Sequence, residues 1–202
     1  VSETNTLLMS KTYEPTCEIA KLFPSQGTWS EAEYLALEAS QIVEFDSGYV
    51  EVHSIPSLRH QLIVRQLFQL LDSQGIGTVM FAPLPIRLWD GKYREPDIAV
   101  LSPASLRELD GQPQGAELVV EVLSDGPTNR QRDLVIKREE YARAGIEEYW
   151  IADPANQTIT VHRLTEANYE PHGVFHTGEE LTSPKYESLR LNVAQVFGSL
   201  DQ

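Results

Sequence analysis

The sequence predicts an α/β or α+β fold in which helices flank a mixed β-sheet. Two short, nearly continuous apolar runs, 98–101 and 118–123, are typical of strands that are buried on both faces. Apolar residues at helical spacing between 57 and 73 predict an amphipathic helix that could cover such a sheet. Strand and helix patterns alternate without an internal repeat, which favours layers of helix and sheet around a core.

The N-terminal part of the chain is predicted to contain an arm followed by a short helix. Residues 1–26 mix polar residues with prolines and show no clean period, so we expect a mobile or loosely docked arm. The folded domain is expected to span 27–202. Ser30 and Glu33 have the spacing of a capping box, which predicts a helix that begins there and continues through Ala39.

A hairpin and a long helix are expected next. Two β-rich runs within 42–52 flank Asp-Ser-Gly, which is typical of a hairpin turn. The amphipathic helix over 57–73 should end before Gly75. The segment 78–89 is predicted to form one strand or hairpin arm, interrupted by two prolines.

The second half of the chain is predicted to place a helix between strands. A helix over about 130–144 should be stopped by Gly145. The runs 148–152 and 158–162 have strand composition and are joined by a short turn. We expect one or two more strands in the tail, followed by an amphipathic helix near 193–200.

Composition fits a globular protein, but the charge is unusual. Of the 202 residues, 41% are hydrophobic and 23% are charged, which argues against a disordered, fibrous or membrane protein. Lys and Arg together number 16 and Asp and Glu 30, so the formal net charge is −14. An acidic surface repels nucleic acid and cytoplasmic membrane faces, so any nucleic-acid interpretation needs a local exception.

The sequence favours a cytoplasmic protein. Its single cysteine, Cys17, cannot form a disulfide within the chain, which is typical of a reducing compartment. No apolar run reaches the length of a membrane span, and the first residues lack the pattern of a signal peptide.

Two carboxylates in apolar surroundings are candidates for a metal site. Glu121 lies inside the apolar run 118–123, where an ionised carboxylate needs a cation, hydrogen bonds or an open cleft. Asp97 lies at the mouth of the other buried strand. Adjacent strands could bring both side chains to one end of the sheet, where they would suit Mg²⁺ or Mn²⁺. Alternatively, Asp97 only accepts backbone hydrogen bonds and Glu121 pairs with Arg94.

The helix that follows Glu121 adds a candidate cation. Asp133, Lys137 and Tyr141 are spaced four residues apart and share one helical face. If that face is aimed at the end of the strand, the Lys137 ammonium could orient an attacking water and offset phosphate charge. The alternative is an exposed pair between Asp133 and Lys137 that contributes little.

These acidic segments resemble the PD-(D/E)xK nuclease signature. Two segments carry the resemblance: Pro96-Asp97, and Glu121 within Val-Val-Glu-Val-Leu-Ser. The chain more specifically resembles the Uma-type family of putative restriction endonucleases, a bacterial domain of unknown function. The ordered matches, which together cover about 28–198, lie at 30–35, 43–50, 59–60, 94–97, 120–124, 132–141 and 144–154.

The resemblance implies a restriction-endonuclease-like fold, with an N-terminal helix and β-hairpin added to the sheet, and Mg²⁺-dependent cleavage of phosphodiester bonds. Asp97 and Glu121 would hold the metal, with Mn²⁺ as a possible substitute, and Glu44 would be a third acidic ligand. The signature places a lysine two residues after the glutamate, but Leu123 stands there. Lys137 on the next helix is the expected substitute.

Four other residues are expected to support this site or contact the substrate. His60 either reaches the site or caps its own helix, and Arg94 stands in the same segment as Asp97. Asp133 and Tyr141 would form a second layer that fixes Lys137.

The implied partner is nucleic acid, with DNA favoured over RNA, and no membrane partner is expected. Because the chain is acidic, we expect the isolated protein to bind weakly, non-specifically and in a salt-sensitive way. Basic residues outside the helix at 130–144 would help if the fold gathers them on one face: Arg59, Arg65, Arg87, Lys92 and Arg94.

Two alternatives come from other functional classes. In one, the chain keeps a nuclease fold without activity and acts as a binding or assembly module, for example as a homodimer. That alternative predicts a cleft blocked by an arginine or another side chain. In the other, a metal-dependent enzyme acts on a small phosphate ester, which predicts a narrow pocket in place of a groove.

Overall fold

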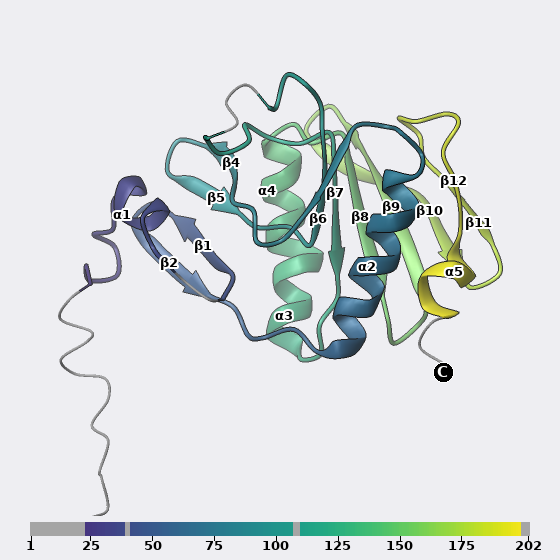
Figure 1. Ribbon diagram of the computed structural model, residues 1–202, viewed down its shortest axis with the longest axis horizontal. Helices are drawn as coiled ribbons and strands as arrows, with labels where there is room; N and C mark the ends of the chain where they lie inside the picture. Colours follow the sequence, from purple (N-terminus) through teal and green to yellow (C-terminus); the bar gives the residue numbers. More distant parts are fainter. Residues whose placement is uncertain (1–22, 39–40, 107–109, 199–202) are drawn as a thin grey trace, which may run out of the picture.

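Figure 1 shows the computed structural model of the chain, which describes residues 23–38, 41–106 and 110–198. Most of the arm predicted at 1–26, including Cys17, therefore lies outside the described residues. At the end of that segment, the Gln26 side chain exchanges two hydrogen bonds of 2.9 Å with the backbone of Val50. Residues next to the predicted domain boundary are thus attached to the first hairpin.

The described elements run in the following order along the chain. The helices are α1 (Glu31–Leu35), α2 (Leu58–Asp72), α3 (Pro127–Gln131), α4 (Lys137–Arg143) and α5 (Val193–Phe197), with a π-helical segment (Arg132–Ile136) between α3 and α4. The strands are β1 (Val43–Asp46), β2 (Tyr49–Val52), β3 (Thr78–Phe81), β4 (Ile86–Trp89), β5 (Lys92–Arg94), β6 (Ile98–Leu101), β7 (Leu118–Val122), β8 (Glu148–Asp153), β9 (Thr158–Thr165), β10 (Asn168–His176), β11 (Glu180–Thr182) and β12 (Arg190–Asn192).

The strands form a mixed central sheet and two smaller antiparallel sheets. The central sheet has six strands in the order β10-β9-β8-β7-β6-β3. Within it, β7 and β8 are parallel and the other neighbours are antiparallel. The first hairpin belongs to a four-stranded sheet of order β2-β1-β5-β4, and β11 pairs with β12. The prediction of a mixed sheet flanked by helices is confirmed.

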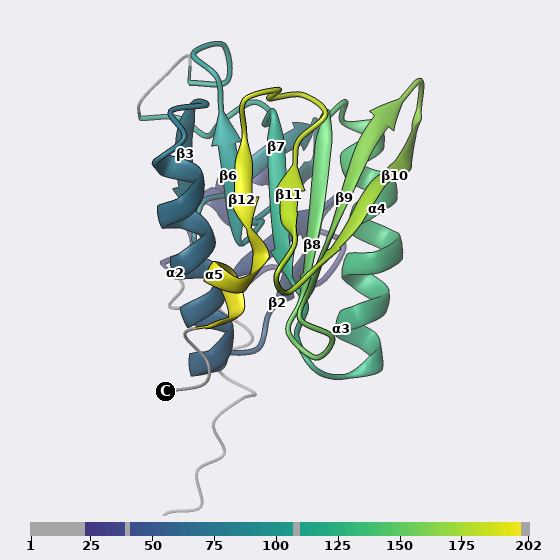
Figure 2. The ribbon, with the colours of Figure 1, turned by 90° about the vertical axis from the view of Figure 1, so that its right-hand side faces the viewer.

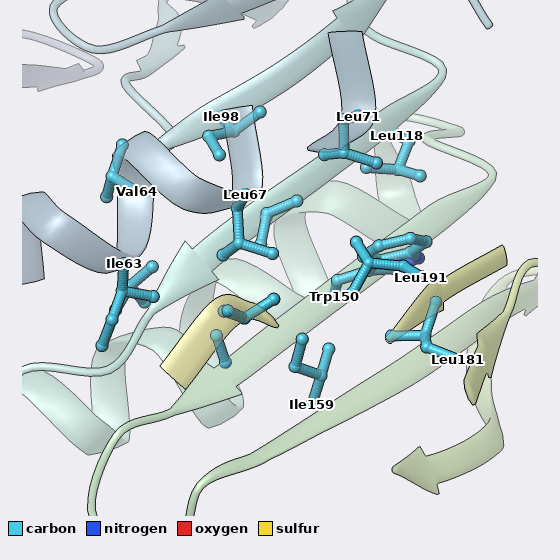
Figure 3. Close-up of a cluster of buried hydrophobic side chains, with 14 of the residues drawn as sticks. Ile63, Val64, Leu67, Leu71, Ile98, Leu118, Trp150, Ile159, Leu181 and Leu191 are labelled. Atoms are coloured by element: carbon cyan, nitrogen blue, oxygen red, sulfur yellow. The ribbon is translucent and has the colours of Figure 1, made fainter. Parts of the chain in front are cut away.

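The central sheet is covered on both faces, as its continuous apolar strands predict. Figure 2 shows α2 and α5 on one side of the sheet and α3 and α4 on the other. Alternate residues of β6 belong to two hydrophobic clusters on opposite faces of the sheet. Ile98 packs in the cluster that contains Leu67 of α2, which we call the α2 core, and Ala99 packs in the cluster that contains Tyr141 of α4, which we call the α4 core. Figure 3 shows the α2 core, where Leu67 and Trp150 are fully buried. Glu121, between Val120 and Val122 of the α2 core, therefore faces α4.

The first helix is shorter than the sequence predicts. Its capping box is confirmed, because Ser30 Oγ accepts from the Glu33 backbone N–H at 3.2 Å and the Glu33 carboxylate accepts from Ser30 N–H at 2.8 Å. The helix ends at Leu35, however, and the predicted end at Ala39 lies outside the described residues. Below about 12 residues a helix depends on tertiary packing, and here only Tyr34 is buried.

The prediction of one strand or hairpin arm over 78–89 is wrong. β3 ends at Phe81 and joins the central sheet, whereas β4 begins at Ile86 and joins the four-stranded sheet. Pro83 and Pro85 lie between them, and prolines cannot donate to a strand ladder. The prolines therefore mark a change of sheet.

In the second half, one helix boundary and the number of tail strands differ from the predictions. The helix predicted at 130–144 begins at Pro127, a residue type that suits the first helical turn, and it contains the π-helical segment at 132–136. The tail forms three strands, β10 to β12, where one or two were expected. π-Helical turns occur often at functional sites, and this one lies directly before Lys137.

Candidate functional site

Asp97 and Glu121 lie at the same end of two adjacent strands. β6 and β7 are antiparallel with Ile98 opposite Val120, so the residue before β6 meets the last part of β7. Asp97 Oδ2 accepts a hydrogen bond of 2.8 Å from the backbone N–H of Val122. The strand order therefore brings the two predicted carboxylates together.

Glu121 is held from the α4 side. Lys137 Nζ donates to its Oε1 at 2.8 Å, and the Tyr141 hydroxyl donates to the same oxygen at 2.7 Å. All three residues are at least nine-tenths buried. The lysine is thus placed beside the glutamate from the following helix.

Glu44 contacts the same lysine from the other sheet. Its Oε1 lies 3.0 Å from Lys137 Nζ, and its Oε2 accepts from Arg94 Nη1 at 2.5 Å. The backbone N–H of Glu95 donates to Oε1 at 3.2 Å. Lys137 therefore lies between the carboxylates of Glu44 and Glu121.

Arg94 does not pair with Glu121, so that alternative is wrong. Its Nε donates to Glu140 Oε2 at 2.7 Å and its Nη2 to Glu140 Oε1 at 3.0 Å, in addition to the contact with Glu44. Arg94 joins the hairpin glutamate to α4 because the four-stranded sheet packs against that helix.

The supporting roles expected of Asp133 and Tyr141 stay predictions, and the structure shows the contacts that each residue makes. The Tyr141 hydroxyl donates to Glu121 Oε1, and Asp133 Oδ1 accepts from Arg132 Nε at 3.1 Å. Among the described residues, neither side chain hydrogen-bonds to Lys137, but the nearby Asp133 helps to raise the pKa of Lys137. An exposed pair between Asp133 and Lys137 is wrong, since both side chains are buried. The π-helical segment begins one residue before Asp133, which alters the regular four-residue spacing.

His60 contributes to the site through its ring. Its Nε2 lies 3.2 Å from Asp97 Oδ2 and 3.1 Å from the carbonyl oxygen of Val122. The helix itself is capped by Ser57, whose Oγ accepts from the His60 backbone N–H at 3.2 Å. Of the two interpretations of His60, the structure therefore favours contact with the site.

A small cavity joins these side chains. Its volume is about 40 Å³, enough for an ion or a few waters. We call this space the carboxylate cavity. The ionisable residues that line it are His53, His60, Glu95, Asp97, Glu121, Arg132, Asp133 and Lys137. Glu44, which contacts Lys137, and Arg94, which contacts Glu44, are not among the residues that line it.

Glu95 is a site residue that the sequence interpretation missed. Its Oε1 accepts from the backbone N–H of Val43 at 3.2 Å, but its buried Oε2 has no hydrogen-bond partner among the described residues. Burial raises the pKa of Glu95 to about 7. The available signal was its position two residues before Asp97, because alternate residues of an extended segment share a side.

Excess negative charge shapes the electrostatics of the cavity. Burial raises the pKa of Glu121 to about 8, and the nearby Asp97 adds to the rise, although Lys137 opposes it. Burial also raises the pKa of Asp133. Burial alone would lower the pKa of Lys137, but Glu121 and Glu44 raise it well above its ordinary value, so the lysine stays protonated. The cavity can accept a further positive charge.

A second group of possible metal ligands lies on the first hairpin. Ligand atoms of Glu44, Glu51 and His53 are within 4.8 Å of one another. Hairpin register places Glu44 opposite Glu51, and His53 follows two residues later, so the pattern could have been found from the sequence. Arg94 Nη1 already lies 2.5 Å from Glu44 and 3.9 Å from Glu51. The guanidinium thus supplies the positive charge at this place.

Three of the five residues that could have contributed to a basic face pair with acidic side chains. Lys92 and Arg94 are buried and pair with acidic residues of the hairpin and α4, while Arg87 pairs with Asp90 and Glu31. Arg59 donates to the carbonyl oxygen of Pro154 at 2.6 Å. Much of this positive charge is therefore held in contacts within the molecule.

Comparisons with known proteins agree with this architecture. A model of the Uma2 family, described as putative restriction endonuclease, matches residues 31–194. A crystal structure from Anabaena variabilis, described as a putative nuclease belonging to DUF820, is similar with a TM-score of 0.66 and 22% sequence identity. The match covers 84% of this chain and 97% of that chain, and it confirms the restriction-endonuclease-like fold. No curated protein matches this chain. Among the described residues, no helix has the length and apolarity to cross a membrane.

Proposed function

We propose that this chain, which belongs to the Uma2 family, is a metal-dependent nuclease that hydrolyses phosphodiester bonds of nucleic acid. One observation carries the proposal. Asp97 and Glu121 line the same cavity, and the protonated Lys137 lies 2.8 Å from Glu121. Two carboxylates and a fixed ammonium at one place supply the parts that phosphodiester hydrolysis needs.

The carboxylate cavity fits a divalent cation with a preference for oxygen ligands. Asp97 and Glu121 would hold Mg²⁺ or Mn²⁺, and the unpartnered Oε2 of Glu95 offers another oxygen. A cation would also offset the charge that raises the pKa of Glu121 and Glu95. When bound, it would supply Lewis-acid activation of water and of the scissile phosphate.

The surrounding residues would position these groups. Lys137 stays protonated, so its role is to orient water and to offset charge that develops on the phosphate, not to accept a proton. Tyr141 fixes one oxygen of Glu121, and the ring of His60 lies against Asp97. These contacts limit the rotation of both carboxylates.

Glu44 is proposed to act through Lys137. Both of its oxygens contact cations, and the residue does not line the carboxylate cavity. Its expected role as a direct metal ligand stays a prediction. In the proposed arrangement, Glu44 holds Lys137 at the position that the signature gives to a lysine on the strand.

The open cavity favours the enzyme over an inactive nuclease fold. An inactive module was expected to have its cleft blocked by an arginine or another side chain. Arg94, however, binds Glu44 and Glu140 and does not line the cavity. Arg132 lines the cavity, yet its guanidinium contacts Asp133 and Asn129. Among the described residues, neither arginine makes a hydrogen bond to Asp97 or Glu121.

The test is a calorimetric titration of Mg²⁺ and Mn²⁺ into the wild type, Asp97→Asn and Asp72→Asn. DNA and RNA cleavage is assayed on the same samples. Asp72, at the exposed end of α2, serves as a matched control. We expect Asp97→Asn to lose binding and cleavage and the control to keep both. Cleavage that survives in Asp97→Asn, or metal-independent cleavage, would contradict the proposal.

A further inference from the structure

A second cavity adjoins the carboxylate cavity and is much larger. Its volume is about 470 Å³, within the range of small-molecule sites. Asp97 lines both cavities, together with Ile42, Ser54 and Pro56. A ligand whose reacting group lies at Asp97 can therefore extend into this second space, which we call the side cavity.

The walls of the side cavity present exposed apolar surface. Phe81 is 52% exposed, and its ring packs edge-on against Phe68, with ring centroids 5.1 Å apart. Ile55, which is 78% exposed, and Pro83 also line the cavity. An exposed aromatic ring at a concave site is suited to stacking with another flat ring.

Two amide side chains complete the lining. Gln41 and Gln61 line the cavity, and no hydrogen bond of either side-chain amide is found within the described ranges. Gln61 lies on α2 and is exposed, so its amide is available to a ligand. Glutamine amides match the hydrogen-bonding edges of nucleobases. Stacking surface and amide donors together indicate a nucleobase.

The apolar wall is attached to the carboxylate site. The backbone N–H of Ala82, next to Phe81, donates to the carbonyl oxygen of Asp97 at 3.2 Å. The ring that would stack and the carboxylate that would face the phosphate are thus joined by one hydrogen-bonded segment. A nucleotide with its phosphate at Asp97 would have its base in the side cavity.

We propose that the side cavity binds an unpaired nucleobase, so that the substrate is a single-stranded nucleic acid. The inference rests on the proposed function and adds its substrate class. A base stacked inside a duplex cannot enter a side cavity without being extruded. A duplex also carries twice the charge per length of a single strand, and this chain has a net charge of −14.

Binding of the base is tested separately from cleavage. Binding of the four nucleoside 5′-monophosphates and of ribose 5-phosphate is measured by calorimetry in Mg²⁺. We expect the wild type to bind at least one nucleotide about tenfold more tightly than the sugar phosphate. Phe81→Ala should remove most of this difference without changing the affinity for ribose 5-phosphate.

Two further variants guard against a folding defect in Phe81→Ala. Ile55→Ala changes a largely exposed side chain and should also weaken nucleotide binding. Met80→Ala, one residue away on β3 with its side chain on the opposite face, is the matched control and should leave binding unchanged. Equal binding of nucleotides and ribose 5-phosphate by the wild type would overturn the inference, as would an equal loss in Met80→Ala.

The preference for single strands is measured as the binding, in Mg²⁺, of a fluorescent single-stranded oligonucleotide and of its matched duplex. Both carry phosphorothioate linkages so that they are not cleaved. We expect at least about tenfold tighter binding of the single strand. Equal or tighter binding of the duplex would overturn the inference. If the wild type prefers nucleotides but cleaves no nucleic acid, the result supports base binding in the side cavity and contradicts the nuclease proposal. Failure of the inference and failure of the proposed function can therefore be distinguished.

Discussion

Two buried glutamates lie on neighbouring parallel strands, Glu121 on β7 and Glu148 on β8, but their surroundings differ. Glu148 is fully buried, and both of its oxygens accept hydrogen bonds from neutral donors. Oε1 accepts from Ser183 Oγ at 2.5 Å and from Lys185 N–H at 2.7 Å, and Oε2 accepts from Trp150 Nε1 at 2.7 Å. Glu148 thus attaches the segment before β12 to the central sheet.

Glu121 is held at one oxygen only. Lys137 and Tyr141 both donate to Oε1, and no hydrogen bond to Oε2 is found in the described part of the chain. Glu121 also lines a cavity that other carboxylates share. A carboxylate whose two oxygens both accept hydrogen bonds from neutral donors has a structural role. A carboxylate that lines a charged cavity and has one oxygen without a hydrogen bond can bind a ligand there. The following predictions test this difference.

The largest effect is expected from removal of the shared cation. Lys137→Met leaves Glu44 and Glu121 buried without their ammonium, so the free energy of unfolding should fall by about 3–5 kcal/mol near neutral pH. Urea unfolding measures the change. Lys185→Met is the control, since this partly exposed lysine should contribute only about 0–1 kcal/mol. Similar losses in both variants would contradict the central role of Lys137.

The two glutamates should respond differently to the same substitution. Glu121→Gln should lower Mg²⁺-dependent cleavage by about 100-fold or more, because the cavity loses a proposed metal ligand. Glu148→Gln should leave metal affinity unchanged but destabilise the fold by about 1–3 kcal/mol, since an amide N–H₂ would face other donors. Calorimetry with Mg²⁺ and thermal unfolding measure the two effects. A loss of metal affinity in Glu148→Gln would abolish the distinction.

Metal affinity should rise with pH. The pKa values of Glu121 and Glu95 are raised to about 8 and about 7, so both carry protons in part at neutral pH that a cation must displace. Below pH 7 the affinity should fall by about tenfold per unit for each proton released. Titrations at pH 6.0 and 8.5 in buffers of different ionisation enthalpy measure the effect and the protons released.

The same raised pKa values predict how the metal-free protein responds to pH. A carboxyl whose folded pKa lies above its unfolded value binds more protons when folded, so stability falls as pH rises between those two values. We expect the melting temperature without metal to drop between pH 6 and pH 8.5 and Mg²⁺ to restore it. Equal metal affinity at both pH values would contradict the charge excess in the cavity.

The smallest effect is expected from the hydroxyl that fixes Glu121. Tyr141→Phe removes one hydrogen bond to Oε1 and should lower metal affinity or cleavage by about tenfold. Tyr169→Phe is a matched control, because its buried hydroxyl donates to the carbonyl oxygen of Ile146 at 2.6 Å. The control should lose about 1 kcal/mol of stability without a change in metal affinity.

The sequence by itself determined two buried strands of the central sheet and the candidate carboxylates. Continuous apolar runs at 98–101 and 118–123 predicted strands buried on both faces, and β6 and β7 are buried at every position. An acidic residue in such a run is costly to bury, so Glu121 was identifiable from local pattern alone. The capping box at Ser30 was also local, and it formed as predicted.

Tertiary structure alone decided which charges meet. Glu44, Glu121 and Lys137 lie on three elements that are far apart in sequence, and their contacts depend on how the two sheets pack around α4. Periodicity says which side of an element a residue faces, but it does not say which distant side chain it meets. For the same reason Arg94 bound Glu44 in place of Glu121. Hydrogen bonds and ion pairs act over a few ångströms, so they follow the packing that the apolar pattern establishes.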